Sequence, residues 1–267
     1  MNRFNGKALY QPKGKAAEYS PWAVNFYTGC SNDCDYCYCK RGVMSHVWDN
    51  KPHLKKCFKD EDDALSVFKR EIAKNQEVLW QSSILFSFTT DPMLPETIAL
   101  TLGAMQIALD YDVPVKILTK RADWFPLLET PNFIKHKDKI AVGFTLTGRD
   151  DLEPGASPHI ERIDTMRKCK DLGIHTFASI EPIVDLENSD RAISDALPYC
   201  DLFKVGLMSG GAKPDKSALA DFVERWGRIF AKHGIKVYWK DSVRDYLGDD
   251  LVLDMDSSVE SNYNIFK

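Results

Sequence analysis

Four cysteines lie within ten residues near the start of the chain: Cys30, Cys34, Cys37 and Cys39. The first three have the spacing C-x3-C-x2-C, which allows one looping segment to surround a cubane with three thiolate ligands. Three ligands for four irons leave one iron open, and a reactive cluster requires an open coordination position. The spacing therefore predicts a [4Fe–4S] cluster held by Cys30, Cys34 and Cys37.

Cys39 supplies a fourth nearby thiol, so a structural zinc site with four cysteine ligands is an alternative. Zinc sites usually join two separated C-x2-C pairs, whereas these four thiols crowd into one short segment. Simple packing of buried cysteines is a third interpretation. The remaining cysteines, Cys57, Cys169 and Cys200, are scattered. An odd total and the lack of an export signal favour reduced thiols and metal ligation over disulfides.

Composition places the chain among ordinary soluble globular proteins. It has 267 residues, of which 44% are hydrophobic and 28% charged. The net charge of -4 argues against a globally basic nucleic-acid-binding protein but leaves a local basic groove open. No stretch approaches the roughly 20 apolar residues that span a bilayer, and the polar N-terminus lacks the apolar core of a secretory signal. We expect a cytoplasmic protein without membrane contact.

Short apolar runs, nearly continuous in hydrophobicity, alternate with helical patterns. The expected buried strands are 23–27, 84–88, 113–118, 140–146, 175–180, 202–207 and 235–239. Helices are predicted after the acidic residues 60–63, from Pro95 to about Asp110 and from Leu219 to Phe230. A further helix is predicted from the apolar residues that recur at three-residue steps: Ile160, Ile163, Met166 and Cys169.

Strand–helix alternation repeated about six times implies right-handed βαβ units and a parallel sheet. The predicted fold is therefore α/β, a partial (β/α)6 TIM-type barrel with a short C-terminal strand and tail. Residues 1–247 are expected to form a single barrel domain with residues 1–21 as an N-terminal lead-in, followed by a polar tail, 248–267. In such barrels the chemistry gathers at the C-terminal ends of the strands.

Five segments in order carry a resemblance to a known family. They are the cysteine loop after Tyr27, Phe88-Thr89-Thr90-Asp91-Pro92, Leu118-Thr119-Lys120-Arg121, Phe144-Thr145-Leu146-Thr147 with Leu152-Glu153-Pro154 and Pro158, and Gly173-Ile174 leading to Glu181-Pro182-Ile183. With these segments the chain resembles the radical S-adenosylmethionine (radical SAM) superfamily. Within it, the chain is most similar to the spore photoproduct lyase-like branch and to a phage-associated group. The resemblance covers about residues 23–185.

The resemblance implies that SAM chelates the open iron. An electron from a reductant such as ferredoxin or flavodoxin would then cleave SAM to a 5′-deoxyadenosyl radical, which takes a hydrogen atom from the substrate. The chain is shorter than true spore photoproduct lyases and lacks their N-terminal extension. It also has no cysteine after Cys200 to serve as a hydrogen-atom donor of the lyase type. These departures argue against DNA photoproduct repair itself, and the sequence names no catalytic side chain.

The resemblance also assigns roles near SAM. It places Tyr36 near the adenine, where a core aromatic beside the loop is the plainer interpretation. Thr90 and Asp91 would accept hydrogen bonds from the SAM ammonium group, and a simple Asx turn introduced by Pro92 is the alternative interpretation.

Three strand-end residues complete the expected cofactor site. Lys120 would pair with the SAM carboxylate, unless it belongs to a solvated Lys-Arg pair at the start of the next helix. Thr145 would contact the methionine or the ribose, or would merely reflect β-propensity. Glu181 would bind ribose hydroxyls, or form an ion pair with Lys204 on the next strand.

The substrate class suggested by kinship is a nucleic-acid base or nucleotide, in a lyase-like or transferase-like reaction. Lysines between positions 51 and 59, with Trp48 and Phe58, would suit a phosphate backbone, but the acidic residues 61–63 make a solvated face the simpler interpretation. Radical SAM modification of a peptide or protein is one alternative. A non-enzymatic metal-binding or redox protein is the other.

Overall fold

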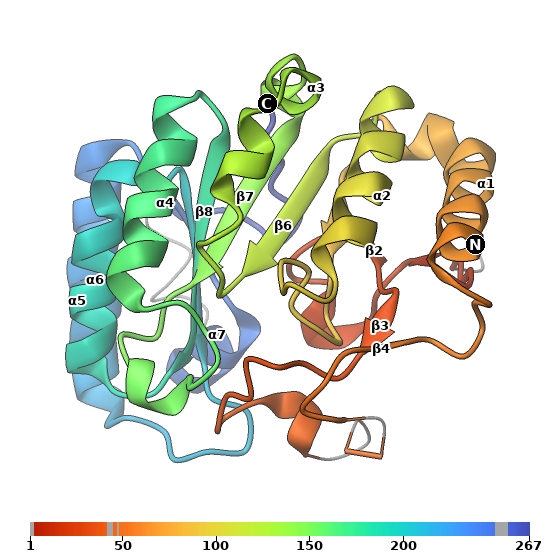
Figure 1. The fold of residues 1–267 in the computed structure, drawn as a ribbon. Helices are drawn as coiled ribbons and strands as arrows, with labels where there is room; N and C mark the ends of the chain where they lie inside the picture. Colours follow the sequence, from red (N-terminus) through yellow and green to blue (C-terminus); the bar gives the residue numbers. More distant parts are fainter. Residues whose placement is uncertain (1–2, 42–44, 47, 249–255) are drawn as a thin grey trace.

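The computed structural model describes residues 3–41, 45–46, 48–248 and 256–267 (Figure 1). Parts of the expected lead-in (1–2) and tail (249–255) lie outside the described residues. The strands are β1 (Leu9–Tyr10), β2 (Trp22–Val24), β3 (Tyr27–Thr28), β4 (His53–Leu54), β5 (Ile84–Phe86), β6 (Val115–Thr119), β7 (Ile140–Thr145), β8 (His175–Ile183), β9 (Leu202–Leu207) and β10 (Lys236–Trp239). The helices are α1 (Glu61–Leu79), α2 (Ile98–Asp110), α3 (Pro131–Ile134), α4 (His159–Asp171), α5 (Leu186–Ala196), α6 (Lys216–His233) and α7 (Asp241–Leu247).

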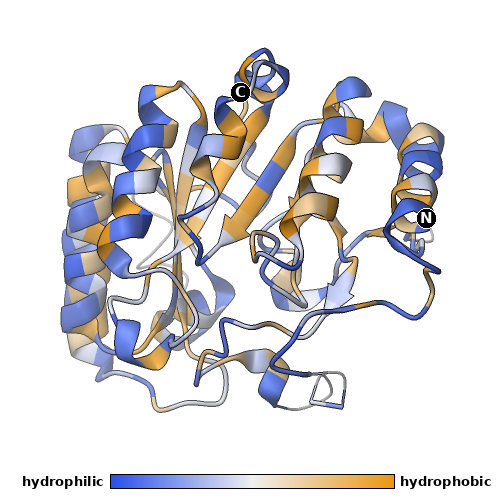
Figure 2. Ribbon diagram, viewed as in Figure 1, coloured by the Kyte–Doolittle hydropathy of each residue, from blue (hydrophilic) through white to orange (hydrophobic). Residues whose placement is uncertain are grey.

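The main sheet has the strand order β1-β2-β5-β6-β7-β8-β9-β10. Strand β1 pairs antiparallel with β2, and the other pairings are parallel. Over the described residues β1 and β10 remain edges, so the curved sheet is an open, partial barrel, as the strand–helix alternation predicted. The helices cover its outer face with their apolar sides turned toward the strands (Figures 1 and 2).

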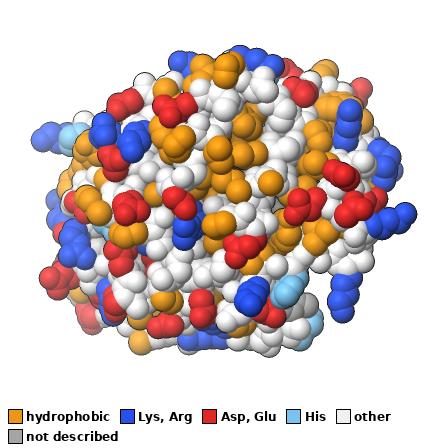
Figure 3. Space-filling view, viewed as in Figure 1, with side chains coloured by type: hydrophobic (Ala, Val, Ile, Leu, Met, Phe, Trp, Pro, Cys, Tyr) orange, Lys and Arg blue, Asp and Glu red, His pale blue; other side chains and the backbone are white. Residues whose placement is uncertain are grey.

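Helix ends follow the capping chemistry of the sequence. The Asp60 carboxylate accepts a hydrogen bond of 2.8 Å from the Asp63 backbone N–H, which starts α1. Gly234 ends α6 with φ of +67°, a left-handed conformation that suits glycine. Side chains of both charges are interspersed over the face seen in Figure 3. None of the helices in the described part of the chain combines the length and apolarity that crossing a bilayer requires.

The first barrel strand is shorter than the expected run 23–27. Strand β2 ends at Val24 because the Asn25 side chain replaces the next ladder hydrogen bonds: its Oδ1 accepts from the Phe88 N–H and the Ser87 hydroxyl, both at 2.7 Å. The chain then forms β3, which pairs with β4 in a separate two-stranded sheet. The cysteine loop therefore lies between the two strands of this small sheet, beside the barrel.

The inner face of the barrel is crossed by residues 18–20, here called the lumen segment. The Lys204 ammonium donates to the Glu18 carbonyl at 2.5 Å, and the Lys116 ammonium donates to the Tyr19 carbonyl at 3.1 Å. Lys240 forms an ion pair of 3.0 Å with the Glu18 carboxylate. Buried lysines of β6 and β9, and Lys240 just after β10, thus hold the segment, so part of the expected N-terminal lead-in is built into the barrel.

Residues of the C-terminal end fill the opposite end of the same inner face. Ile265 is buried in a cluster with Tyr19 and Phe177, and the Phe266 ring lies 5.4 Å from the ring of His175 at the start of β8. Because these side chains occupy the strands' N-terminal ends, the open space lies at their C-terminal ends.

Replacing Lys116 with methionine is expected to stabilise the protein at neutral pH. Burial lowers the pKa of Lys116 to about 8, whereas an unfolded lysine titrates near ~10.4. The unfolded chain therefore binds more protons between these values, so wild-type stability rises as the pH goes from about 8 to about 10. We expect a gain of about 1–2 kcal/mol at pH 7, since the Tyr19 carbonyl loses its donor but the buried charge disappears.

Urea unfolding of Lys116→Met and wild type at pH 7 and pH 10 measures this effect. Lys232→Met, on the exposed side of α6, is the matched control. A stability difference that is the same at both pH values would contradict the interpretation.

Candidate functional site

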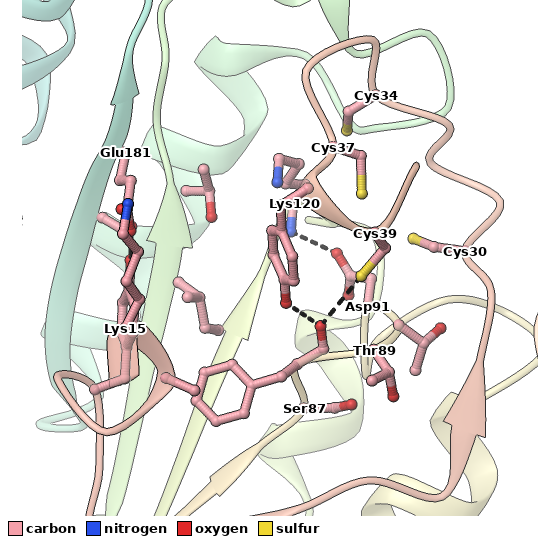
Figure 4. Close-up of a pocket in the computed structure, with 18 of the residues that line it drawn as sticks. Lys15, Cys30, Cys34, Cys37, Cys39, Ser87, Thr89, Asp91, Lys120 and Glu181 are labelled. Carbon is pink, nitrogen blue, oxygen red and sulfur yellow. Dashed lines mark hydrogen bonds between the residues drawn. The ribbon is translucent and has the colours of Figure 1, made fainter. Parts of the chain in front are cut away.

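A cavity of about 560 Å³ opens at the C-terminal ends of the strands, where the fold class predicted the site (Figure 4). The cysteine loop forms one wall, with the sulfur atoms of Cys30, Cys34 and Cys37 turned toward the cavity. Lys120 stands in the middle, and Glu181 belongs to the opposite wall. All nine sequence-predicted site residues, the three cysteines, Tyr36, Thr90, Asp91, Lys120, Thr145 and Glu181, line this one cavity.

Gly29 allows the cysteine loop to leave β3 sharply. Its φ is +83°, and a Cβ at this position would lie 2.2 Å from the Lys51 carbonyl oxygen. The next residue, Cys30, donates its backbone N–H to the Asp49 carbonyl at 2.9 Å. The segment around Asp49 and Lys51 therefore packs directly on the loop and leaves no room for a side chain.

The thiols differ in their surroundings. Burial, assisted by the Asp91 carboxylate, raises the pKa of Cys30 to about 12. A hydrogen bond from Cys39 lowers the pKa of Cys37 to about 6 and raises that of Cys39. Cys39 also approaches the Phe88 carbonyl, at 3.8 Å. Among the described residues, no group of three potential ligands is close enough to hold a single metal ion.

Asp91 connects the cysteine loop to two strand ends. Its Oδ2 accepts from the Asn32 side-chain amide at 2.8 Å and from the Lys120 backbone N–H at 2.7 Å. Its Oδ1 accepts from the Thr119 hydroxyl at 2.6 Å and from the Met93 N–H at 3.0 Å. Because each oxygen already has two donors, the carboxylate braces the site, and its expected role toward the SAM ammonium stays a prediction.

The loop after β7 clamps the cysteine loop from the other side. Asp35 donates its N–H to the Leu152 carbonyl at 2.9 Å, and Gly155 donates to the Asn32 carbonyl at 3.0 Å. A Cβ on Gly155 would lie 2.2 Å from the Ser31 carbonyl oxygen. The segment containing Leu152 thus lies against the backbone that carries the thiols.

A buried ion pair fixes this clamp. Glu153 and Arg162 pair with side chains 0% and 1% exposed, and the Tyr36 hydroxyl donates to the same carboxylate. Arg162 also donates to the Thr145 and Ser157 carbonyls, each at 2.7 Å. Tyr36 is therefore held on its hydroxyl side by the clamp while it lines the cavity.

Lys120 lies close to the Tyr36 ring, with its ammonium nitrogen 5.5 Å from the ring centroid. Burial opposes its charge, but the surrounding groups, Tyr36 first among them, outweigh this and raise the pKa of Lys120 well above its usual value. Arg121, by contrast, turns outward to an ion pair of 2.6 Å with Asp123. Lys120 is thus a partly buried cation at the cavity, whereas the neighbouring Arg121 is engaged by Asp123 and by the Gly155 carbonyl.

Two buried polar atoms at the cavity lack a hydrogen-bond partner within the described structure: Asn32 Oδ1 and Thr90 Oγ1. Buried polar atoms in proteins are normally hydrogen-bonded, so an orphan beside a cavity indicates a ligand group.

The far wall carries a second set of polar groups. Glu181 Oε2 accepts from the Tyr19 hydroxyl at 2.6 Å and pairs with Lys240 at 2.5 Å. The expected alternative, an ion pair between Glu181 and Lys204, is not the pairing that forms, because Lys204 points to the lumen segment instead. Ser179 completes the wall through a 2.7 Å hydrogen bond to Tyr19.

Sequence reasoning missed Tyr19, Lys240, Asn32 and Arg162. Lys240 had a detectable signal, since it directly follows the apolar strand β10 just as Lys120 follows β6. Tyr19 and Arg162 had no such sequence signal, because the path of the lumen segment and the buried side of α4 are determined by tertiary packing.

Comparisons with known proteins give distant relatives. No family model matches the chain. A viral protein, ORF301 of Acidianus two-tailed virus, is 25% identical over 61% of this chain and 56% of its own length. The uncharacterized protein MJ0683 of Methanocaldococcus jannaschii is 24% identical over 68% of each chain. The chain therefore spans between about half and two thirds of these relatives.

Solved structures resemble the chain more closely in fold than in sequence. Spore photoproduct lyase complexed with dinucleoside spore photoproduct has a TM-score of 0.53 at 19% identity, covering 74% of this chain and 59% of the lyase. Streptococcus suis SuiB bound to S-adenosylmethionine has a TM-score of 0.54 at 13% identity, covering 80% and 48%. Both are radical SAM enzymes. The resemblance inferred from the sequence is thus confirmed for the fold: the chain has the partial barrel of radical SAM enzymes such as spore photoproduct lyase.

Proposed function

We propose that the chain binds a [4Fe–4S] cluster through Cys30, Cys34 and Cys37 and reductively cleaves S-adenosylmethionine in the adjoining cavity. The observation that carries the proposal is the convergence of these three thiols on one cavity at the strand ends. When bound, the cluster supplies the electron for this cleavage, and the resulting 5′-deoxyadenosyl radical takes a hydrogen atom from the substrate.

The residues present fit the two cofactors. Thiolates are the usual protein ligands of iron–sulfur clusters, and the cysteine loop is braced from both sides by Asp91 and by the loop containing Leu152. Asn32 Oδ1 and Thr90 Oγ1 offer unpaired acceptors for a bound ammonium or hydroxyl group.

The remaining predicted roles are consistent with the positions in the cavity. Lys120 would pair with the carboxylate of SAM, because it is a partly buried cation next to the cysteine wall. Tyr36 would lie along the adenine, with its hydroxyl anchored to Glu153. Thr145 would contact the ribose or methionine part, and Glu181 the ribose hydroxyls.

We further propose that the substrate is a nucleic-acid base or nucleotide and that a small reductant such as ferredoxin or flavodoxin donates the electron. Support for this substrate class comes from the shared fold with a lyase that is complexed with a dinucleoside photoproduct. Residues 1–247 would act as one barrel domain, with the remainder as a tail.

The test is anaerobic purification and cluster reconstitution, followed by dithionite reduction with SAM and chromatography for 5′-deoxyadenosine. We expect this product from the wild type and none from Cys34→Ala, because the variant lacks one ligand. Iron content without the product, or zinc in place of iron, would refute the proposal and favour a structural or redox role.

A further inference from the structure

A second cavity, of about 690 Å³, adjoins the cysteine cavity at its mouth. It is formed by the hairpin-like N-terminal residues 3–13, and it shares Tyr10 and Lys13 with the first cavity. The two cavities are therefore neighbours, and one extended molecule that occupied both would pass Tyr10 and Lys13.

Its lining contains two cations, Arg3 and Lys13, and no carboxylate. In the part of the chain that the structure describes, the only partner of Arg3 is the Pro12 carbonyl at 3.3 Å, and Lys13 has none. A guanidinium has five N–H donors, so most of those on Arg3 remain available. This local excess of positive charge contrasts with the mixed charges over the face in Figure 3.

The scaffold that carries the two cations is fixed. Gln11 donates its backbone N–H to the Phe4 carbonyl at 3.0 Å, and its side-chain oxygen accepts from the Phe4 N–H at 2.9 Å. The Tyr10 hydroxyl accepts from the Asn25 side-chain amide at 2.6 Å. These hydrogen bonds fix the backbone of the segment that carries the two cations.

One aromatic side chain is shared by the two cavities and another lines the first. Tyr10 lines both, and Tyr38, 54% exposed, lines the first cavity with its hydroxyl bonded to the Phe88 carbonyl. Aromatic rings in one cavity and cations in a neighbouring one favour ligands that combine a flat base with a phosphate, because the base stacks and the phosphate pairs with the cation.

We propose that the second cavity binds a phosphate group of the substrate through Arg3 and Lys13, and that the attached base reaches past Tyr10 into the cysteine cavity. This inference rests on the proposed function, which supplies a nucleotide-type substrate. It adds a phosphate subsite that is separate from the cysteine wall. The phosphate belongs either to a polynucleotide strand or to a single nucleotide.

Fluorescence anisotropy of the full chain with a fluorescein-labelled thymidine strand of about eight nucleotides tests the subsite. We expect Arg3→Ala/Lys13→Ala to bind at least about tenfold more weakly than wild type. The slope of log K against log salt should also become shallower by about 0.7, because one phosphate contact on a single strand contributes about that much. Lys216→Ala/Lys232→Ala, which removes the same charge from α6 on the outer layer, is the matched control.

Competition with unlabelled thymidine monophosphate identifies the source of the phosphate. Displacement of the strand by the mononucleotide supports a single nucleotide, and displacement by unlabelled strand alone supports a polynucleotide. Three results would overturn the subsite. They are equal affinity of the two double variants for the strand, an unchanged salt slope in Arg3→Ala/Lys13→Ala, and displacement of the strand by an acidic peptide as well as by a nucleotide. The wild type's formation of 5′-deoxyadenosine is measured separately, so failure of the subsite and failure of the proposed function are distinguishable.

Discussion

Replacing Cys34 with alanine is expected to reduce the iron bound after reconstitution to background while leaving a folded barrel. Cys34 lies on the wall of the cavity, is buried, and stands within a loop held by Asp91 and by the Leu152 carbonyl. The substitution removes one of three thiolates but disturbs neither brace. Iron analysis and the absorbance of the reconstituted protein measure cluster loading, and circular dichroism measures the fold.

Cys39→Ala is the matched control for this prediction. Cys39 lies two residues after Cys37 and is as buried as Cys34, but its thiol is directed to the Phe88 carbonyl. We expect this variant to keep its cluster. Full iron content in Cys34→Ala would refute the ligand assignment, and loss of iron in Cys39→Ala would restore the model with four thiolates.

Arg162→Met is expected to lower the free energy of unfolding by about 3–5 kcal/mol. The substitution leaves the Glu153 carboxylate buried without its cation, and the Thr145 and Ser157 carbonyls lose their donor. Since Glu153 also holds the Tyr36 hydroxyl, the clamp on the cysteine loop should loosen. Urea denaturation measures the stability, and iron uptake by the folded fraction measures the effect on the loop.

Arg167→Met, on the exposed side of the same helix, is the matched control. It separates the effect of losing a buried cation from the effect of losing a surface charge. Arg167 is 43% exposed and pairs with Asp164 and Asp171 at the surface. Surface ion pairs contribute about 0–1 kcal/mol, so this variant should stay close to wild type. Similar losses in the two variants would show that Arg162 acts as an ordinary surface charge. The double variant Arg162→Met/Glu153→Leu should recover part of the stability lost in the single variant.

The features that the sequence predicted are those with a local physical cause. The thiol spacing depends only on neighbouring residues, and the buried strands were recognised by their continuous hydrophobicity. The convergence of Thr90, Lys120 and Glu181 followed from one topological rule, that parallel strands end at the same edge. Each of these inferences needed only the order of elements along the chain.

The features that the sequence could not predict depend on which side chains contact each other in the folded protein. The three-residue steps on α4 predicted Ile160 with the apolar residues, yet it is 69% exposed, whereas Arg162 is 1% exposed. From sequence alone, Arg162 is expected at the surface, because arginines are seldom buried unless they are paired, and its buried partner Glu153 could not be identified. In the same way, the sequence indicated that Glu181 needs a partner. It could not show that Lys240 pairs with Glu181 while Lys204 binds the lumen segment, because that depends on the path of the lumen segment.

The lumen segment also affects the order in which parts of the protein can fold during synthesis. Glu18 accepts a hydrogen bond from the Asp241 N–H, 223 residues further along the chain. At about 5–20 residues per second, a ribosome needs roughly ten seconds or more to deliver that partner. Until then the Glu18 carboxylate stays in water, and the interior of the nascent barrel is incomplete. The cysteine half can form before Asp241 is synthesised, whereas the wall with Glu181 becomes fixed only afterwards.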